Sequence, residues 1–102
     1  MSQPGSAASA LESAHGRVAK EILEEIGSAF ARANEKVDVA LQALERARAS
    51  LAAERSAERV AAFNKARACA ANAIWELRVH REALGMVDHR QHEEGWKLPD
   101  PA

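Results

Sequence analysis

The sequence contains few of the residues that cross-link a small fold, fill its core with aromatic rings or interrupt its helices. Among its 102 residues there is one cysteine, no tyrosine, and only 4% aromatic side chains. The single cysteine, Cys69, cannot form an internal disulfide, so we expect a small buried thiol and a reducing, cytoplasmic setting. No apolar run approaches the ~20 residues that a bilayer span requires. Residues 1–10 also lack the basic-then-apolar pattern of a secretory signal, so we expect no membrane association.

Glycine and proline are also scarce, with five and three residues respectively, and neither occurs between Ser28 and Leu84. What fills this long stretch is mainly Ala, Glu, Arg and Leu, the residues with the highest helix propensity, and alanine alone contributes 24 residues to the chain. Alternating β-branched residues, which are typical of strands, are missing. The composition therefore predicts an all-α fold.

Short capping patterns indicate where the helices begin and end. Ser9 with Glu12 three residues later resembles a capping pair, Ser56 is placed to cap a second helix, and Gly85 is placed to close it. Pro99 and Pro101 favour an extended tail. We therefore predict a disordered lead over 1–8, a single helical domain over 9–95 with helices at 9–53, 57–84 and 89–94, and an extended tail over 96–102.

Two apolar seams run along the two long predicted helices. In the first seam apolar residues recur every three or four positions, and in the second every seven, as in a coiled coil. They change register between Leu51 and Val60, which predicts a tight turn near 53–56. The members are Leu23, Ile26, Phe30, Ala33, Val37, Ala40, Leu44, Ala47 and Leu51 in the first seam, and Phe63, Ala70, Leu77 and Leu84 in the second, flanked by Val60 and Ile74.

The two predicted helices differ in length, and this mismatch bears on assembly. A first helix over 9–53 would be about 67 Å long at 1.5 Å per residue, and the second much shorter. Val18, Ile22 and Ile26 would then have no partner within the chain. We therefore predict a long antiparallel helical hairpin that forms a homodimer with a four-helix arrangement. The alternative is a compact three-helix bundle with another turn near Asn34, because Asn tolerates turn conformations.

Charge is unevenly distributed although the formal net charge is only −1. Residues 1–45 carry four basic and seven acidic residues (net −3), 46–81 carry eight and three (net +5), and 82–102 carry two and five (net −3). An acidic first helix lying along a basic second helix would balance these charges without an external ligand. The basic segment 46–81, including Arg55 and Arg59, also leaves nucleic-acid binding as an alternative function.

The region from Ile74 to His89 has large apolar residues on more than one helical face. Trp75, Val79 and Met86 lie off the main seam, and Trp96 could fold back over it. Such a region is either the thickest part of the core or an exposed surface for a protein partner. These four residues are the partner-binding candidates.

Histidine and carboxylate residues near the end of the chain suggest a metal site as another alternative. His80, His89 and His92 lie among several carboxylates, and imidazole with carboxylate can bind zinc or iron. Glu12 and His15 have the Glu-x-x-His spacing of carboxylate-bridged di-iron bundles, although the chain holds one copy of that pair. The sequence has no phosphate-binding loop, nucleophile elbow or other catalytic motif, so we expect no enzymatic activity and no cofactor.

One resemblance to a known family rests on residues 74–89 and on the early run Ala19-Lys20-Glu21-Ile22-Leu23. Arg81-Glu82-Ala83-Leu84-Gly85 after Trp75 and Leu77, with Leu98-Pro99 in the tail, resembles a family of short bacterial helical proteins without an assigned function. That family has Gln before the Arg-Glu pair, where this chain has His80. The resemblance implies a small helical bacterial protein with no catalytic residues. With the composition, it favours a non-enzymatic interaction or adaptor protein.

Overall fold

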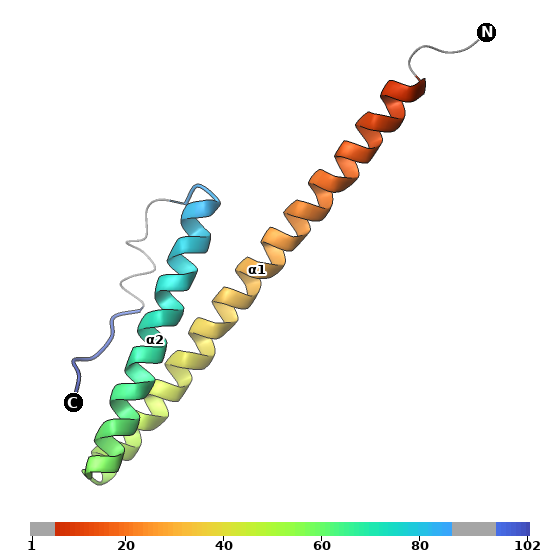
Figure 1. The fold of residues 1–102 in the computed structure, drawn as a ribbon. Helices are drawn as coiled ribbons and strands as arrows, with labels where there is room; N and C mark the ends of the chain where they lie inside the picture. Colours follow the sequence, from red (N-terminus) through yellow and green to blue (C-terminus); the bar gives the residue numbers. More distant parts are fainter. Residues whose placement is uncertain (1–5, 87–95) are drawn as a thin grey trace.

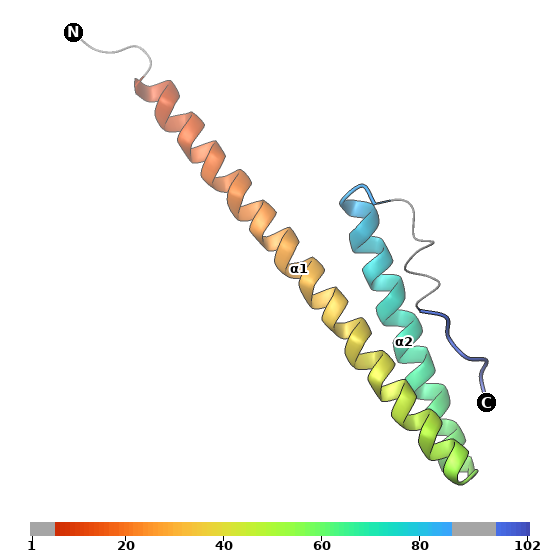
Figure 2. The same cartoon turned by 180° about the vertical axis from the view of Figure 1, so that it is seen from behind.

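The structure is a computed structural model, and it describes residues 6–86 and 96–102. Two helices account for most of the described chain: α1 (Ser6–Ala53) and α2 (Ala57–Ala83). They pack antiparallel as an extended hairpin, and residues 96–102 run along α2 (Figures 1 and 2). The all-α hairpin predicted from the sequence is therefore confirmed.

The turn between the helices lies at residues 54–56, within the predicted stretch. The Ser56 side chain accepts a hydrogen bond from the backbone N–H of Arg59 at 3.2 Å, which caps the first turn of α2. At the other end of α2, Gly85 has a positive φ of 82°. This conformation lets Met86 N–H donate to the Arg81 carbonyl at 2.9 Å, and Gly85 N–H to the Glu82 carbonyl at 3.0 Å. Both ends of α2 are thus fixed by the residues that the sequence indicated.

The core of the hairpin lies between the second half of α1 and α2, and it consists of two small clusters. Alanines let the two helix backbones approach closely, and a few larger side chains fill the remaining space. Trp96 and Leu98 of the tail pack against the first cluster, and Leu98 also packs against the second. The buried members are Ala33, Val37, Ala73, Ile74 and Leu77 in the first cluster and Leu44, Phe63 and Ala70 in the second.

The compact three-helix alternative is wrong, because α1 continues through Asn34 without a turn. The Asn34 side chain instead donates a hydrogen bond to the Phe30 carbonyl at 3.0 Å, one helical turn earlier. The radius of gyration is 22.0 Å, whereas a compact domain of about 100 residues has a radius of about 13 Å. A run of strong helix formers on both sides of Asn34 outweighs the weak turn preference of one residue.

The first helix differs from the prediction at its start. It begins at Ser6 rather than Ser9, so part of the predicted lead, residues 6–8, is helical, and its first turn contains no acidic residue. Alanines at positions 7, 8 and 10 favour helix before the Ser9 and Glu12 pair is reached. The predicted short helix over 89–94 lies outside the described residues.

The two helices overlap over only half of α1. Every side chain from 9 to 28 is exposed except half-buried Ala14, and the first fully buried residue is Ala33. We call residues 6–28 of α1 the overhang and residues 29–53 its paired half. Figure 1 shows the overhang as the long end of α1 that extends beyond α2. Within the described residues, no helix has the length and apolar composition needed to cross a membrane.

One ion pair between the helices is arranged opposite to the expected charge pairing. It places the base on α1 and the acid on α2, with Lys36 Nζ 3.4 Å from Glu76 Oε2. Four of the acidic residues of α1, Glu12, Glu21, Glu24 and Glu25, lie on the overhang, beyond the reach of α2. The net-charge argument counted these four residues as lying along α2, whereas α2 covers only the second half of α1.

Replacing a core side chain tests the packing of the hairpin. Leu77→Ala removes one of the largest fully buried side chains, and it should lower the free energy of unfolding by about 2–5 kcal/mol. Val79→Ala on the exposed face of the same helix should change it by less than about 0.5 kcal/mol. Urea unfolding of both variants at one protein concentration measures this difference. Equal effects of the two substitutions would contradict the observed packing.

Candidate functional site

The most conspicuous exposed feature is an apolar stripe along the overhang. Leu11, Val18, Ile22 and Ile26 are 61%, 52%, 54% and 38% exposed. Their spacing of seven and then four residues keeps them on one face of the helix. That face continues into the paired half of α1 as Ala33, Val37 and Leu44, which are buried against α2. The overhang stripe (Leu11, Val18, Ile22 and Ile26) is therefore an extension of the core face without a cover.

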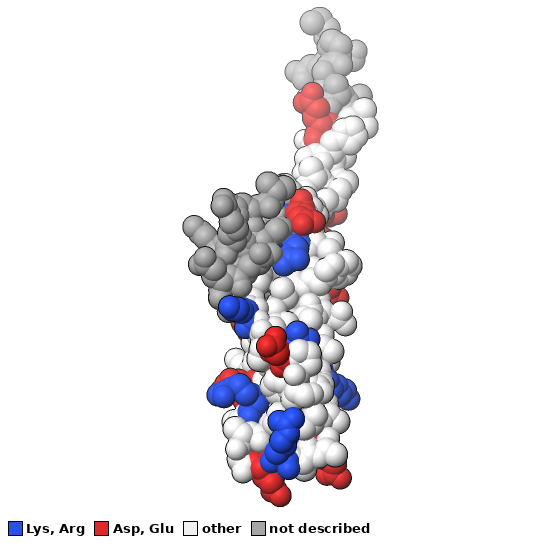
Figure 3. All heavy atoms as spheres, turned by 90° about the vertical axis from the view of Figure 1, so that its left-hand side faces the viewer, with Lys and Arg blue, Asp and Glu red and all other residues white. Residues whose placement is uncertain are grey.

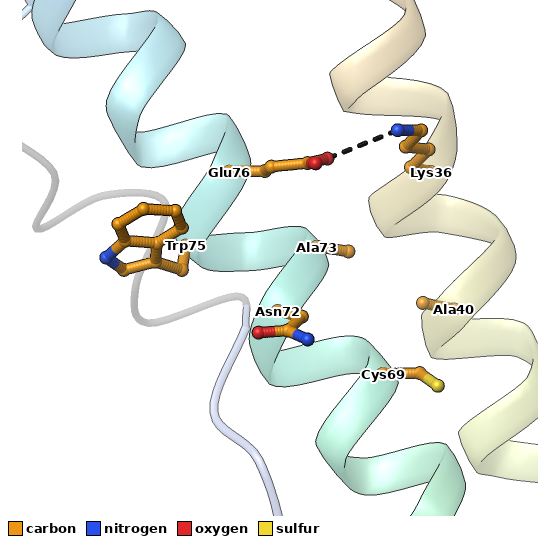
Figure 4. Close-up of a pocket in the computed structure, with 7 residues that line it drawn as sticks. All are labelled: Lys36, Ala40, Cys69, Asn72, Ala73, Trp75 and Glu76. Atoms are coloured by element: carbon orange, nitrogen blue, oxygen red, sulfur yellow. Dashed lines mark hydrogen bonds and ion pairs between the residues drawn. The ribbon is translucent and has the colours of Figure 1, made fainter.

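A shallow groove follows the line between the two helices on one side of the hairpin. One section of it has a volume of about 500 Å³, with Val39, Ala40 and Ala43 of α1 and Cys69 of α2 as its apolar lining and Arg32, Glu35 and Lys36 of α1 as its charged lining. Figure 4 shows an adjoining section, in which Cys69 and Ala73 of α2 point toward α1 and the Lys36–Glu76 ion pair crosses above them. We call Val39, Ala40, Ala43, Cys69 and Ala73 the groove. Its small side chains explain why sequence reasoning missed it.

The C-terminal tail covers another side of the hairpin. The Asn64 side chain donates to the Ala102 carbonyl at 3.0 Å and accepts from the Ala102 N–H at 2.8 Å. Arg67 Nε donates to the Pro99 carbonyl at 2.6 Å. With Leu98 packed on both core clusters, these contacts hold residues 96–102 against α2. This side is closed by the tail, whereas on the groove side the lining within residues 6–86 and 96–102 comes from the two helices.

The four partner-binding candidates do not share one environment. Trp75 is 62% exposed, and Val79 and Met86 are also exposed. In Figure 4 the Trp75 side chain points away from α1. Trp96 is half-buried and packs against the first core cluster. The interpretation of this region as the thickest part of the core holds for Ile74 and Leu77, while Trp75, Val79 and Met86 form an exposed outer strip on α2.

Cys69 is exposed in the structure, so the expectation of a buried thiol is wrong. Its neighbour Ala70 occupies the buried position. Because successive helical residues are rotated by about 100°, Cys69 falls on the flank of α2, where it lines the groove. Two neighbouring alanines alone did not reveal which of the three small residues faces α1.

The metal candidates are not brought together in the described part of the chain. Glu12 and His15 are exposed on the overhang, and half-buried His80 lies near the other end of α2, close to Glu76 and Lys36. His89 and His92 lie outside the described residues. Among residues 6–86 and 96–102, no three His, Cys, Asp or Glu side chains gather in a way that could hold a metal ion.

The basic candidates for nucleic-acid binding occupy structural positions in part. Arg59 Nη1 donates to the Ser50 carbonyl at 2.8 Å, and Arg59 Nη2 lies 3.5 Å from a Glu54 carboxylate oxygen. Arg59 therefore ties the turn to the end of α1. Most Lys and Arg atoms visible in Figure 3 lie over the paired part of the molecule with acidic atoms among them, and the far end of the overhang shows red and white atoms.

An acidic and a basic side chain interact on the exposed surface of α1. Arg48 Nε donates to a Glu45 carboxylate oxygen at 2.9 Å. This hydrogen bond lowers the pKa of the Glu45 carboxyl below its ordinary value. An exposed pair one helical turn apart contributes little to stability.

Comparison of this chain with protein families, with curated proteins and with solved structures gave no match in any of the three. The candidate site therefore rests on the geometry of the hairpin itself. That geometry leaves three apolar surfaces open: the overhang stripe, the groove, and the outer strip.

Two single-tryptophan variants test the different environments of the tryptophans. Trp96→Phe leaves exposed Trp75, whose emission should be at longer wavelength and strongly quenched by iodide. Trp75→Phe leaves half-buried Trp96, whose emission should be at shorter wavelength and less quenched, because core packing excludes water and quencher. Equal quenching of both variants would contradict the position of the tail.

Proposed function

We propose that this chain is a non-enzymatic helical interaction protein that works as a homodimer. The observation that carries the proposal is the overhang stripe, four large aliphatic side chains on one face of a helix, 38% to 67% exposed together with neighbouring Leu23. An apolar face of this length without a cover is typical of a protein–protein contact surface. A second copy of the same chain is always available as a partner.

The size of the stripe sets what kind of association it supports. Full burial of one such side chain is worth about 1.5–3 kcal/mol, and about half of that remains to be gained at each residue of the stripe. Summed over two copies, the gain is about 6–12 kcal/mol, comparable with the roughly 4–15 kcal/mol that association costs. The stripe therefore supports a dimer, and further apolar area is needed to make the dimer tight.

The adaptor part of the proposal concerns the outer strip. Trp75 and Val79 are four residues apart and share the face of α2 that is turned away from the core, and exposed Met86 follows beyond the end of the helix. Exposed tryptophan and methionine are enriched at protein interfaces. The overhang stripe continues the core-facing side of α1, whereas the outer strip faces away from the core. We therefore assign the outer strip to a different protein partner.

The homodimer is tested by adding a charge to the stripe. Ile22→Glu should weaken self-association by about 100-fold, because each dimer would lose the burial of two isoleucine side chains and would have to desolvate two carboxylates. Helix content should be unchanged, since Ile22 is already half-exposed in the single chain. Sedimentation velocity over a range of protein concentrations, with circular dichroism, measures both.

Ser13→Glu provides the matched control for that experiment. Ser13 is exposed on the same overhang, nine residues before Ile22, and therefore on the opposite face of the helix. The same added charge there should leave the dimer intact. A wild-type chain that sediments as a single copy at high concentration, or an Ile22→Glu variant that still dimerises like the wild type, would overturn the proposal.

A further inference from the structure

The groove offers a place for the overhang of a second copy. Small side chains and Val39, which is 56% exposed, form its floor, and the charged residues Arg32, Glu35 and Lys36 of α1 also line it; residues 96–102 do not contribute to it. A further hollow, which shares Arg32 and Lys36 with the groove, continues its line along α1 back to Ala29. The groove and this hollow therefore run alongside the paired half of α1, and Ala29 lies next to the overhang.

The sequence of α1 connects the overhang stripe to the groove by a seven-residue repeat. Ile22, Ala29, Lys36 and Ala43 follow one another at intervals of seven. Two helices that wind gently around each other stay in contact along such a repeat. A second α1 that contacts the stripe at Ile22 would therefore contact the groove at Ala43 without leaving the same line.

The lengths of the two halves of α1 match. Ala29 is at the midpoint of Ser6–Ala53, and it is also where the burial by α2 begins. Each half is about 35 Å long at 1.5 Å per residue. Two antiparallel α1 helices related by a two-fold axis near Ala29 would each place the overhang along the paired half of the other.

The overhang and the rest of the hairpin carry opposite net charge. Residues 6–28 carry four acidic and two basic residues (net −2), whereas the paired half of α1 together with the turn and α2, residues 29–86, carries seven acidic and ten basic residues (net +3). An overhang lying against the overhang of the other copy would bring two negative segments together, whereas an overhang in the groove brings a negative segment to a positive one.

From these observations we infer that the homodimer forms by reciprocal insertion: the overhang of each copy lies in the groove of the other. The inference rests on the proposed self-association and specifies its geometry. Around each half of the dimer, α1 and α2 of one copy and the overhang of the other form a three-helix layer. The stripe then gains the apolar cover that α2 is too short to give.

The native thiol of Cys69 makes this arrangement measurable. Val18 lies eleven residues before Ala29 and Ala40 lies eleven after it, and Ala40 lines the groove together with Cys69. In the reciprocal dimer, Val18 of one copy therefore lies near Cys69 of the other. Val18→Cys exchanges one small apolar side chain for another, so that the interface keeps its character.

The test is cross-linking of the Val18→Cys variant, either by oxidation or with a short bis-maleimide, followed by peptide mapping. The result expected is a covalent dimer in which the introduced thiol is joined to Cys69 of the other copy. Ser13→Cys, on the opposite face of the overhang, should give at least about tenfold less of this product, because a disulfide forms only between cysteines whose Cα atoms are close.

Other products separate a failure of this geometry from a failure of self-association. A link between the two introduced thiols, or a dimer in solution that gives no link to Cys69, would overturn reciprocal insertion and leave the homodimer standing. A chain that remains a single copy by sedimentation would overturn the geometry and the homodimer together.

Discussion

The whole structure depends on one mismatch: a single continuous helix of 48 residues presents one apolar face, and the helix that packs on it has 27 residues. α1 is continuous because nothing between Ser28 and Ala53 favours a turn strongly enough to break it. α2 ends at Ala83, and the positive φ of Gly85 closes the helix before it can cover the rest of that face. The same aliphatic stripe is therefore core over the paired half of α1 and surface over the overhang.

The alanine content determines how the paired half is built. Alanines at positions 33, 70 and 73 let the helices pack closely, and the larger buried side chains fill the space between them: Val37, Leu44, Phe63, Ile74 and Leu77. A two-helix core of this kind buries little apolar area. The tail adds to it with Trp96 and Leu98, and its anchors at Asn64 and Arg67 close one side of the hairpin. On the groove side the small side chains Ala40, Ala43 and Cys69 line a hollow in which we propose that another helix packs.

Much of the fold could be predicted from the sequence because it is governed by local signals. The turn at 54–56, the cap at Ser56 and the closing glycine at Gly85 each follow from the preferences of one or two residues. The lack of a partner for Val18, Ile22 and Ile26 followed from counting residues in the two helices. The break proposed at Asn34 was wrong, since one tolerant residue does not interrupt a long run of strong helix formers.

The features that could not be predicted depend on which flank of a helix faces its neighbour. Cys69 and Ala70 are equally small, so that only the packing angle of α2 decides that Ala70 is buried and that Cys69 lines the groove. The tail contacts join residues more than 30 positions apart through backbone carbonyls, and side-chain patterns carry no signal for these. The Lys36–Glu76 ion pair has its base on the helix with the acidic segment and its acid on the helix with the basic segment. The net charge of a segment does not predict which individual residues pair.

Small-angle X-ray scattering of the full chain tests most directly whether one face of α1 is shared between α2 and a second copy. The account predicts the mass of two chains with a longest dimension close to the 83 Å of one chain, because the two α1 helices overlap along their whole length. The mass of one chain would contradict it. The mass of two chains with a longest dimension of about 110 Å, as expected for two helices that overlap only along their overhangs, would contradict it as well.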